Sequence, residues 1–156
     1  MRCLFAQYNM NCKTKIQKVV SRINSLGIEV NLQSNTYGYY QDEELITARW
    51  NGAELDVLCS LLHELGHAIQ SESHFSKLRK SFKRDRAIIA EQEYKAWELG
   101  WQEAIALNIT TPELEIYYNR LWMKCWSGYL STLYSTRTNE QDRVIEYLID
   151  TYASEI

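Results

Sequence analysis

The chain has few of the residues that interrupt regular secondary structure, with one proline and six glycines among 156 residues. It also has no internal repeat and no low-complexity linker. Because domain boundaries usually fall in such linkers, and because this length suits one domain with its own core, we expect a single domain over residues 1–156. The scarcity of proline also favours long helices.

Long apolar runs are missing as well. No segment approaches the ~20 consecutive apolar residues that are needed to span a bilayer, and the N-terminus turns polar too early for a signal peptide. We therefore expect a cytoplasmic protein that has no membrane partner.

Paired cysteines and a large net charge are also absent. The four cysteines, at positions 3, 12, 59 and 125, include no C-x-x-C pair, and we expect all four to be reduced thiols. A net charge of -3 gives no overall reason to expect binding to nucleic acid. Basic residues concentrate only in residues 77–86, which we interpret as a solvated loop; a surface for an acidic protein substrate and a nucleic-acid contact are the alternatives.

Hydrophobic residues make up 46% of the chain and recur at helical and strand spacing. Helices are predicted over residues 14–26, 53–71, 85–107, 112–133 and 140–153. Strands are predicted over residues 28–32, 37–40 and 45–50. The fourth helix has a clear start signal, a threonine followed by proline and glutamate at 111–113. These elements predict an α+β fold, mainly helical, in which a small antiparallel sheet packs on the helix of residues 53–71.

Two of the three histidines, His63 and His67, flank Glu64 and Gly66 in a five-residue H-E-L-G-H motif. Four residues of helix turn through roughly 400°, so both imidazoles project from one face about one turn apart and can bind one metal ion. Glu64 lies next to the first ligand, where it can reach a water on that metal without being a ligand itself. Gly66 keeps this face shallow.

A third ligand is needed, and a metzincin-type histidine does not supply it. That pattern requires a glycine three residues after His67 and a histidine six residues after it, whereas the chain has Gln70 and Ser73 there, with His74 one place too far. Cys59, one turn before the first histidine, is an alternative ligand, although such a cysteine is more often a packing residue.

The predicted helix after residue 85 offers a glutamate instead. Its inward stripe consists of small and aromatic residues with one acid, Glu93, whereas Glu91 belongs to a charged face. An unpaired carboxylate in a packed stripe is costly, and a metal ion on the neighbouring helix would compensate its charge. We therefore predict Glu93 as the third ligand, with Glu91 as the alternative.

The motif of residues 63–67, followed by the sequence EQEYKAW at residues 91–97, resembles the gluzincin branch of the zincin metallopeptidases. In that branch a glutamate on a following helix supplies the third ligand. Within it the chain is similar to the small ImmA/IrrE-type and related phage or mobile-element metallopeptidases, over roughly residues 14 to 107. The resemblance implies a zincin-like domain with one Zn²⁺ per chain, and a host cytoplasmic location if the protein is phage-encoded.

These observations predict a zinc metallopeptidase in which Glu64 activates a zinc-bound water for attack on a peptide bond of a protein or peptide substrate. A phage or mobile-element protein that acts on a host or repressor protein is one form of this hypothesis. The alternative is a non-catalytic binding or regulatory protein, with a structural zinc or an inactive peptidase site.

Further residues are candidates for supporting roles. The strand of residues 45–50 is expected to be a sheet edge that pairs with substrate, by analogy with zincins. His74, Tyr94 and the tyrosines within 37–40 are candidate oxyanion donors, which the sequence does not rank. Tryptophans at i, i+4 spacing are interpreted as helix-packing residues rather than as a ligand-stacking platform. These are Trp97, Trp101, Trp122 and Trp126.

Overall fold

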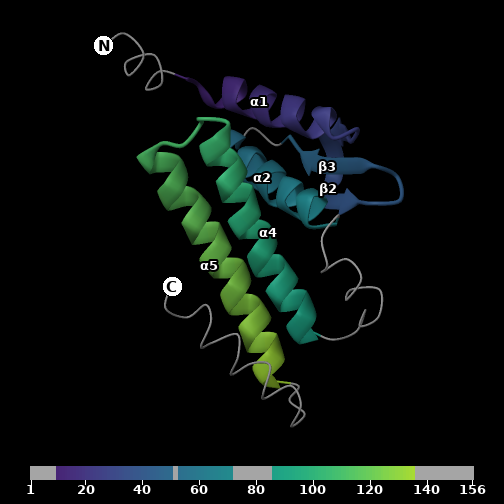
Figure 1. The fold of residues 1–156 in the computed structure, drawn as a ribbon. Helices are drawn as coiled ribbons and strands as arrows, with labels where there is room; N and C mark the ends of the chain where they lie inside the picture. Colours follow the sequence, from purple (N-terminus) through teal and green to yellow (C-terminus); the bar gives the residue numbers. More distant parts are fainter. Residues whose placement is uncertain (1–9, 51–52, 72–85, 136–156) are drawn as a thin grey trace.

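The computed structural model describes residues 10–50, 53–71 and 86–135, which form an α+β fold of helices around a small sheet (Figure 1). In chain order the elements are α1 (Cys12–Ser25), β1 (Glu29–Asn31), β2 (Gln33–Tyr40), β3 (Leu45–Arg49), α2 (Glu54–Ser71), α4 (Arg86–Ala106) and α5 (Pro112–Ser135). The α+β class predicted from the sequence is confirmed. The predicted helix over 140–153, His74 and nearly all of the basic segment 77–86 lie outside the described residues.

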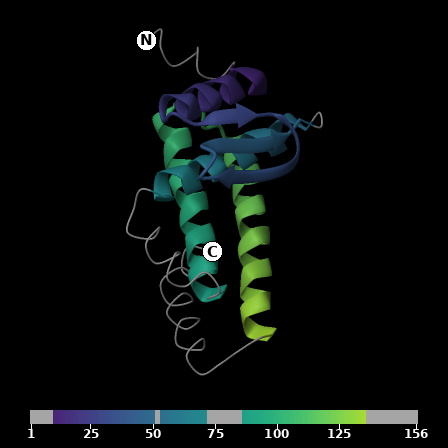
Figure 2. The same cartoon turned by 90° about the vertical axis from the view of Figure 1, so that its right-hand side faces the viewer.

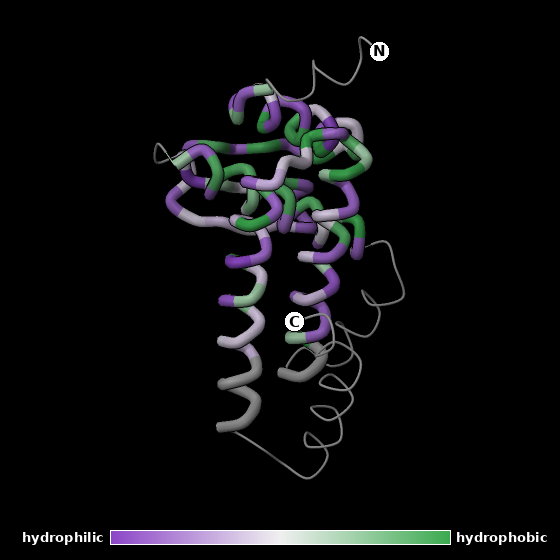
Figure 3. The backbone as a smooth tube through the Cα atoms, turned by 90° about the vertical axis from the view of Figure 1, so that its left-hand side faces the viewer, coloured by the Kyte–Doolittle hydropathy of each residue, from purple (hydrophilic) through white to green (hydrophobic). Residues whose placement is uncertain are grey.

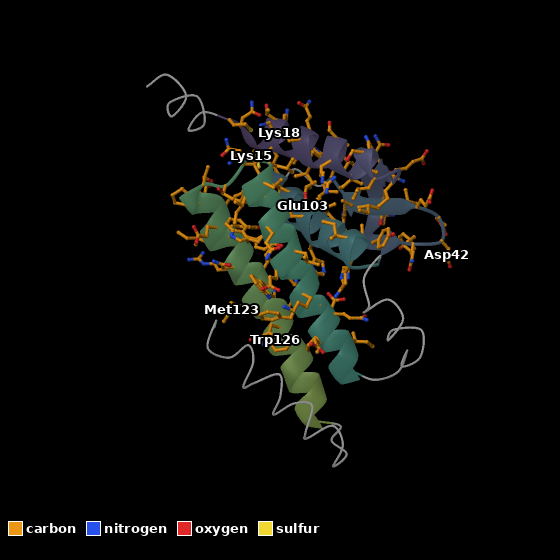
Figure 4. All side chains as sticks on the ribbon, in the orientation of Figure 1. Lys15, Lys18, Asp42, Glu103, Met123 and Trp126 are labelled. Atoms are coloured by element: carbon orange, nitrogen blue, oxygen red, sulfur yellow. The ribbon has the colours of Figure 1, made fainter. Side chains whose placement is uncertain are left out.

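Helices α4 and α5 form an antiparallel pair, and Figures 1 and 2 show that this pair extends well beyond the sheet. Helix α1 lies on the opposite side of the sheet from the free ends of the pair (Figure 1). Arg22 links α1 to α4, because its Nε and Nη2 atoms donate hydrogen bonds to the two carboxylate oxygens of Glu103 on α4 at 2.9 and 3.2 Å. Figure 4 shows Glu103 between these helices.

The sheet differs from the predicted antiparallel one. Its strand order is β1-β3-β2, with β1 parallel to β3 and β2 antiparallel to it. Alternating hydrophobicity predicts that strands exist, but it does not determine which strands become neighbours. Here the chain passes from β1 to β2 around the end of β3, where the Trp50 amide donates to the Leu32 carbonyl at 2.8 Å. The expectation that β3 is an edge strand is therefore wrong, since β3 is central and β1 and β2 are the edges.

The helix ends follow the signals in the sequence. Asn11 caps α1 by accepting a hydrogen bond from the Thr14 amide at 2.9 Å, and Gly27 follows the helix with a φ of 79°, a conformation that favours glycine. Thr111 caps α5 through the Leu114 amide at 3.2 Å, with Pro112 in the first turn as predicted.

The main hydrophobic core lies where α1, the sheet and α2 meet. Figure 3 shows hydrophobic residues gathered in this part and thinning out along the free ends of α4 and α5. Fully buried members include Val19 and Ile23 on α1, Ile46 on β3, and Leu58 and Leu61 on α2. Among the described residues, none of the helices combines the length and apolar character that crossing a membrane requires.

Candidate metal centre

Three side chains from two helices converge on one point. The Nε2 atom of His63 lies 3.0 Å from Glu93 Oε2, and the Nε2 atom of His67 lies 3.3 Å from Glu93 Oε1. The two Nε2 atoms are 3.2 Å apart, and all three donor groups lie within 4.8 Å of one another. The structure thus brings together the three residues that the sequence predicted as metal ligands. Imidazole nitrogens with one carboxylate form a donor set suited to Zn²⁺.

The convergence depends on an unusually close approach of α2 and α4. A Cβ atom at Gly66 would overlap the carbonyl oxygen of Ala96, and one at Gly100 would overlap the carbonyl oxygen of Leu62. Each helix therefore presents a glycine to the backbone of the other, so the two axes lie closer than larger side chains would permit. Glu93 reaches the histidines because of this contact.

The stripe of α4 that was predicted to face inward does so. Its members Ala90, Trp97 and Ala104 are buried, while the Lys95 ammonium pairs with the Glu98 carboxylate at 2.7 Å on the more exposed side. Burial extends further than the stripe, because Tyr94 is also buried on the side where α5 packs.

Glu93 is held as an anion. Burial alone would raise the pKa of its carboxyl, but the hydrogen bonds and charges of His63 and His67 outweigh this effect and hold that pKa well below its usual range. The side chain of Glu93 is 21% exposed and those of both histidines are 12% exposed. A partly accessible, ionised carboxylate beside two imidazoles is the state that a metal ligand requires.

Glu64 lies next to this group but does not belong to it. Its side chain is buried, and burial raises the pKa of its carboxyl; the charges of His63 and His67 act in the opposite direction. The carboxylate accepts a hydrogen bond from the backbone amide of Tyr39, which fixes its position against strand β2. A buried carboxylate whose pKa is raised is a stronger base than an ordinary glutamate, which favours a role in proton transfer.

Trp97 takes part in the site as well as in helix packing. Its indole stacks on the His63 ring with 4.3 Å between centroids and 27° between planes, and it meets the Tyr118 ring edge-on with 5.0 Å between centroids. The Nδ1 atom of His63 is buried and has no hydrogen-bond partner in the described part of the chain. Among the described residues, the His63 ring is therefore oriented by stacking on Trp97 and not by a hydrogen bond to its Nδ1 atom. Sequence reasoning identified Trp97 only as a packing residue.

Tyr129 on α5 is a residue of the site that sequence reasoning missed. Its side chain is half-buried on the part of α5 that approaches Glu93. Burial raises the pKa of this phenol to about 12, and the negative charges of Glu93 and Glu64 contribute. Its place on a helix face shared with Trp122 and Trp126 was readable from the sequence, but the pairing of that face with α4 was not.

The other candidates lie apart from the three donors. Cys59 is fully buried, and burial raises the pKa of its thiol to about 12, which suits the packing role that was favoured for it. Glu91 is half-buried and is not one of the grouped donors. Among the oxyanion candidates, Tyr94 is buried between Trp122 and Trp126, with ring centroids 4.9 and 5.1 Å away.

Tyr37 and Tyr40 on strand β2 are exposed. The Tyr37 hydroxyl donates to the Arg49 carbonyl at 3.2 Å, which holds this side chain across the sheet.

Comparisons of the chain with protein-family models, with curated proteins and with solved structures found no match.

Proposed function

We propose that this protein is a zinc-dependent metallopeptidase that hydrolyses a peptide bond in a protein or peptide substrate. The observation that carries the proposal is the convergence of His63, His67 and Glu93, with Glu64 buried directly beside them. This arrangement agrees with the resemblance of the two motifs to the gluzincin branch of the zincins. A zincin-like domain with one Zn²⁺ per chain is part of the same proposal.

The donor set fits zinc. Two imidazole nitrogens and one ionised carboxylate would hold the ion, and three protein ligands leave a coordination position for solvent or substrate, as catalytic zinc sites do. When bound, zinc would act as a Lewis acid and lower the pKa of a coordinated water from about 15.7 to about 7.

Glu64 would carry the proton transfers. Its carboxylate lies next to the ligands without being one, so it is free to take a proton from the attacking water and to pass it to the leaving amine. The backbone hydrogen bond from Tyr39 favours the ionised form of this carboxylate, which is the form that accepts the proton.

The decisive experiment compares zinc content and peptide cleavage in wild type, Glu64→Gln and Glu93→Ala, with Glu91→Ala as a matched control on the same helix. We expect about one zinc per chain in wild type, Glu64→Gln and Glu91→Ala, and a large loss of zinc in Glu93→Ala. Loss of an outer-shell partner typically lowers metal affinity about 10- to 100-fold, and removal of a ligand should lower it further.

Cleavage is measured by mass spectrometry on a diverse synthetic peptide library. We expect wild type and Glu91→Ala to cleave peptides, and Glu64→Gln to cleave none despite its bound zinc. Zinc retained in Glu93→Ala would overturn the ligand assignment. Wild-type protein that binds zinc but cleaves no peptide would instead support the alternative, a non-catalytic zinc-containing protein.

A further inference from the structure

Helices α2 and α4 lie against each other and touch at regular intervals (Figure 1). Gly100 on α4 faces the carbonyl oxygen of Leu62 on α2, and Gly66 on α2 faces the carbonyl oxygen of Ala96 on α4. From the first contact to the second, α2 advances from residue 62 to 66 while α4 goes back from residue 100 to 96, which is about one turn of each helix. The same spacing brings residue 70 of α2 opposite residue 92 of α4.

The contact at this third position is made by a side chain. The Nε2 atom of Gln70 donates a hydrogen bond to the carbonyl oxygen of Gln92 at 3.2 Å, and the two residues are only 6% and 5% exposed. Because Gln70 has a side chain here, the two backbones cannot approach each other as they do at Gly66. The glycines therefore bring the helices together, and the glutamine sets their separation one turn further on.

The carbonyl that accepts this hydrogen bond belongs to the residue directly before Glu93. In a helix such a carbonyl accepts a hydrogen bond from the amide four residues later, and its second lone pair can accept another from Gln70. Two helices that touch at the glycines alone could still rotate about that contact. A hydrogen bond one turn away removes this freedom, and it does so at the turn from which Glu93 reaches His63 and His67.

We propose that Gln70 is a positioning residue of the metal centre, whose side-chain amide fixes the separation and rotation of α4 relative to α2 at the turn that carries Glu93. The proposal rests on the proposed function in taking His63, His67 and Glu93 as metal ligands. It requires metal binding but not catalysis.

The test measures the zinc affinity of Gln70→Met by competition with a chromophoric chelator, using zinc ions alone. Methionine is close to glutamine in length but has no amide donor, so the substitution removes the hydrogen bond and keeps the space filled. We expect the affinity to fall about tenfold. This is the lower end of the range for outer-shell partners, because Gln70 contacts the backbone beside the ligand and not its carboxylate.

Gln102→Met is the matched control, since it makes the same chemical change at an exposed position of α4. We expect its zinc affinity to stay within about twofold of wild type, as for most surface substitutions. Leu61→Ala is a second control, which lowers stability from a buried position on the other face of α2.

Cobalt substitution separates positioning from a general loss of stability. Visible absorption of the cobalt-loaded protein should differ between wild type and Gln70→Met, because the Glu93 carboxylate approaches the metal from a changed direction. The cobalt spectrum of Leu61→Ala should match that of wild type.

An unchanged cobalt spectrum in Gln70→Met, or a zinc affinity equal to that of wild type, would overturn the proposal. The same spectral change in Leu61→Ala would also overturn it, because the effect would then follow from lost stability. If Gln70→Met weakens zinc binding and changes the spectrum while wild type cleaves no peptide, the peptidase function fails and the role of Gln70 stands.

Discussion

The two faces of helix α2 have different roles and pack differently: one belongs to the hydrophobic core and the other carries the candidate metal ligands. One face carries Leu58 and Leu61 into the core that α1 and the sheet share. The opposite face carries the histidines and Gly66, and it meets α4 at backbone distance. Contacts on the first face are between deformable side chains, whereas those on the second include the direct approach of a glycine to a backbone carbonyl group.

This difference predicts how each face responds to mutation. A core that loses methyl groups keeps its topology. It loses stability, because the neighbouring side chains relax only partly around the cavity. A glycine that faces a backbone carbonyl leaves no side chain able to move aside, so an added methyl group must displace a helix. Substitutions on the two faces of α2 and in the residues that pack on them should therefore differ in their effect on zinc affinity.

Gly66→Ala should have the largest effect. The new methyl group would push α4 away at Ala96 and carry Glu93 away from the histidines. We expect loss of measurable zinc binding by chelator competition, and an unfolding free energy that is lower by about 3 kcal/mol, at the upper end of typical overpacking costs.

Gly128→Ala is the control for this change. Among the described residues, no atom lies within 4 Å of a Cβ atom built at Gly128. The substitution should therefore leave zinc affinity unchanged and raise the unfolding free energy by about 0.5–1 kcal/mol through helix propensity. Normal zinc binding in Gly66→Ala would contradict the idea that a close backbone approach builds the site.

Trp97→Leu should have an intermediate effect on the metal. It removes the ring that stacks on His63. An aromatic stacking contact contributes about 0.5–1.5 kcal/mol, so we expect zinc affinity to fall about two- to tenfold. Trp101→Leu is the matched control one turn along α4, because Trp101 stacks near Tyr118 and not on a histidine. If both variants lose the same affinity, the effect comes from helix packing and not from His63.

Leu61→Ala should have the smallest effect on the metal and a large one on stability. Leu61 is fully buried on the face opposite the histidines. We expect chemical denaturation to give an unfolding free energy lower by about 2–5 kcal/mol, with one zinc per chain still bound by the folded fraction. A lower zinc stoichiometry in fully folded protein would show that the two faces are coupled.

Much of the site was readable from the sequence because its residues lie on helices with regular spacing. The positions of His63 and His67 follow from one helical turn, and that of Glu93 from being the single acid in a packed stripe. The starts of α1 and α5 follow from local capping residues. Each of these inferences depends on only a few neighbouring residues.

The parts that were missed depend on contacts between distant segments. The central position of β3 is set by the path of the chain around its end, which a hydrophobic pattern does not encode. The stacking of Trp97 on His63 and the influence of the Glu93 charge on Tyr129 depend on how closely and in which register three helices pack. Spacing along one helix predicts a face, but not what that face meets.

The strand order also has a consequence for how the chain folds. Strands β1 and β2 follow one another in sequence with only Leu32 between them, yet β3 lies between them in space. Strand β3 can pair with β2 as a simple hairpin, but the sheet is complete only when β3 is also inserted beside β1, a parallel pairing of Glu29 with Leu45 that forms more slowly than the hairpin. Since α2 begins only five residues after β3 ends, we expect the histidines to reach their places late, when that insertion is complete.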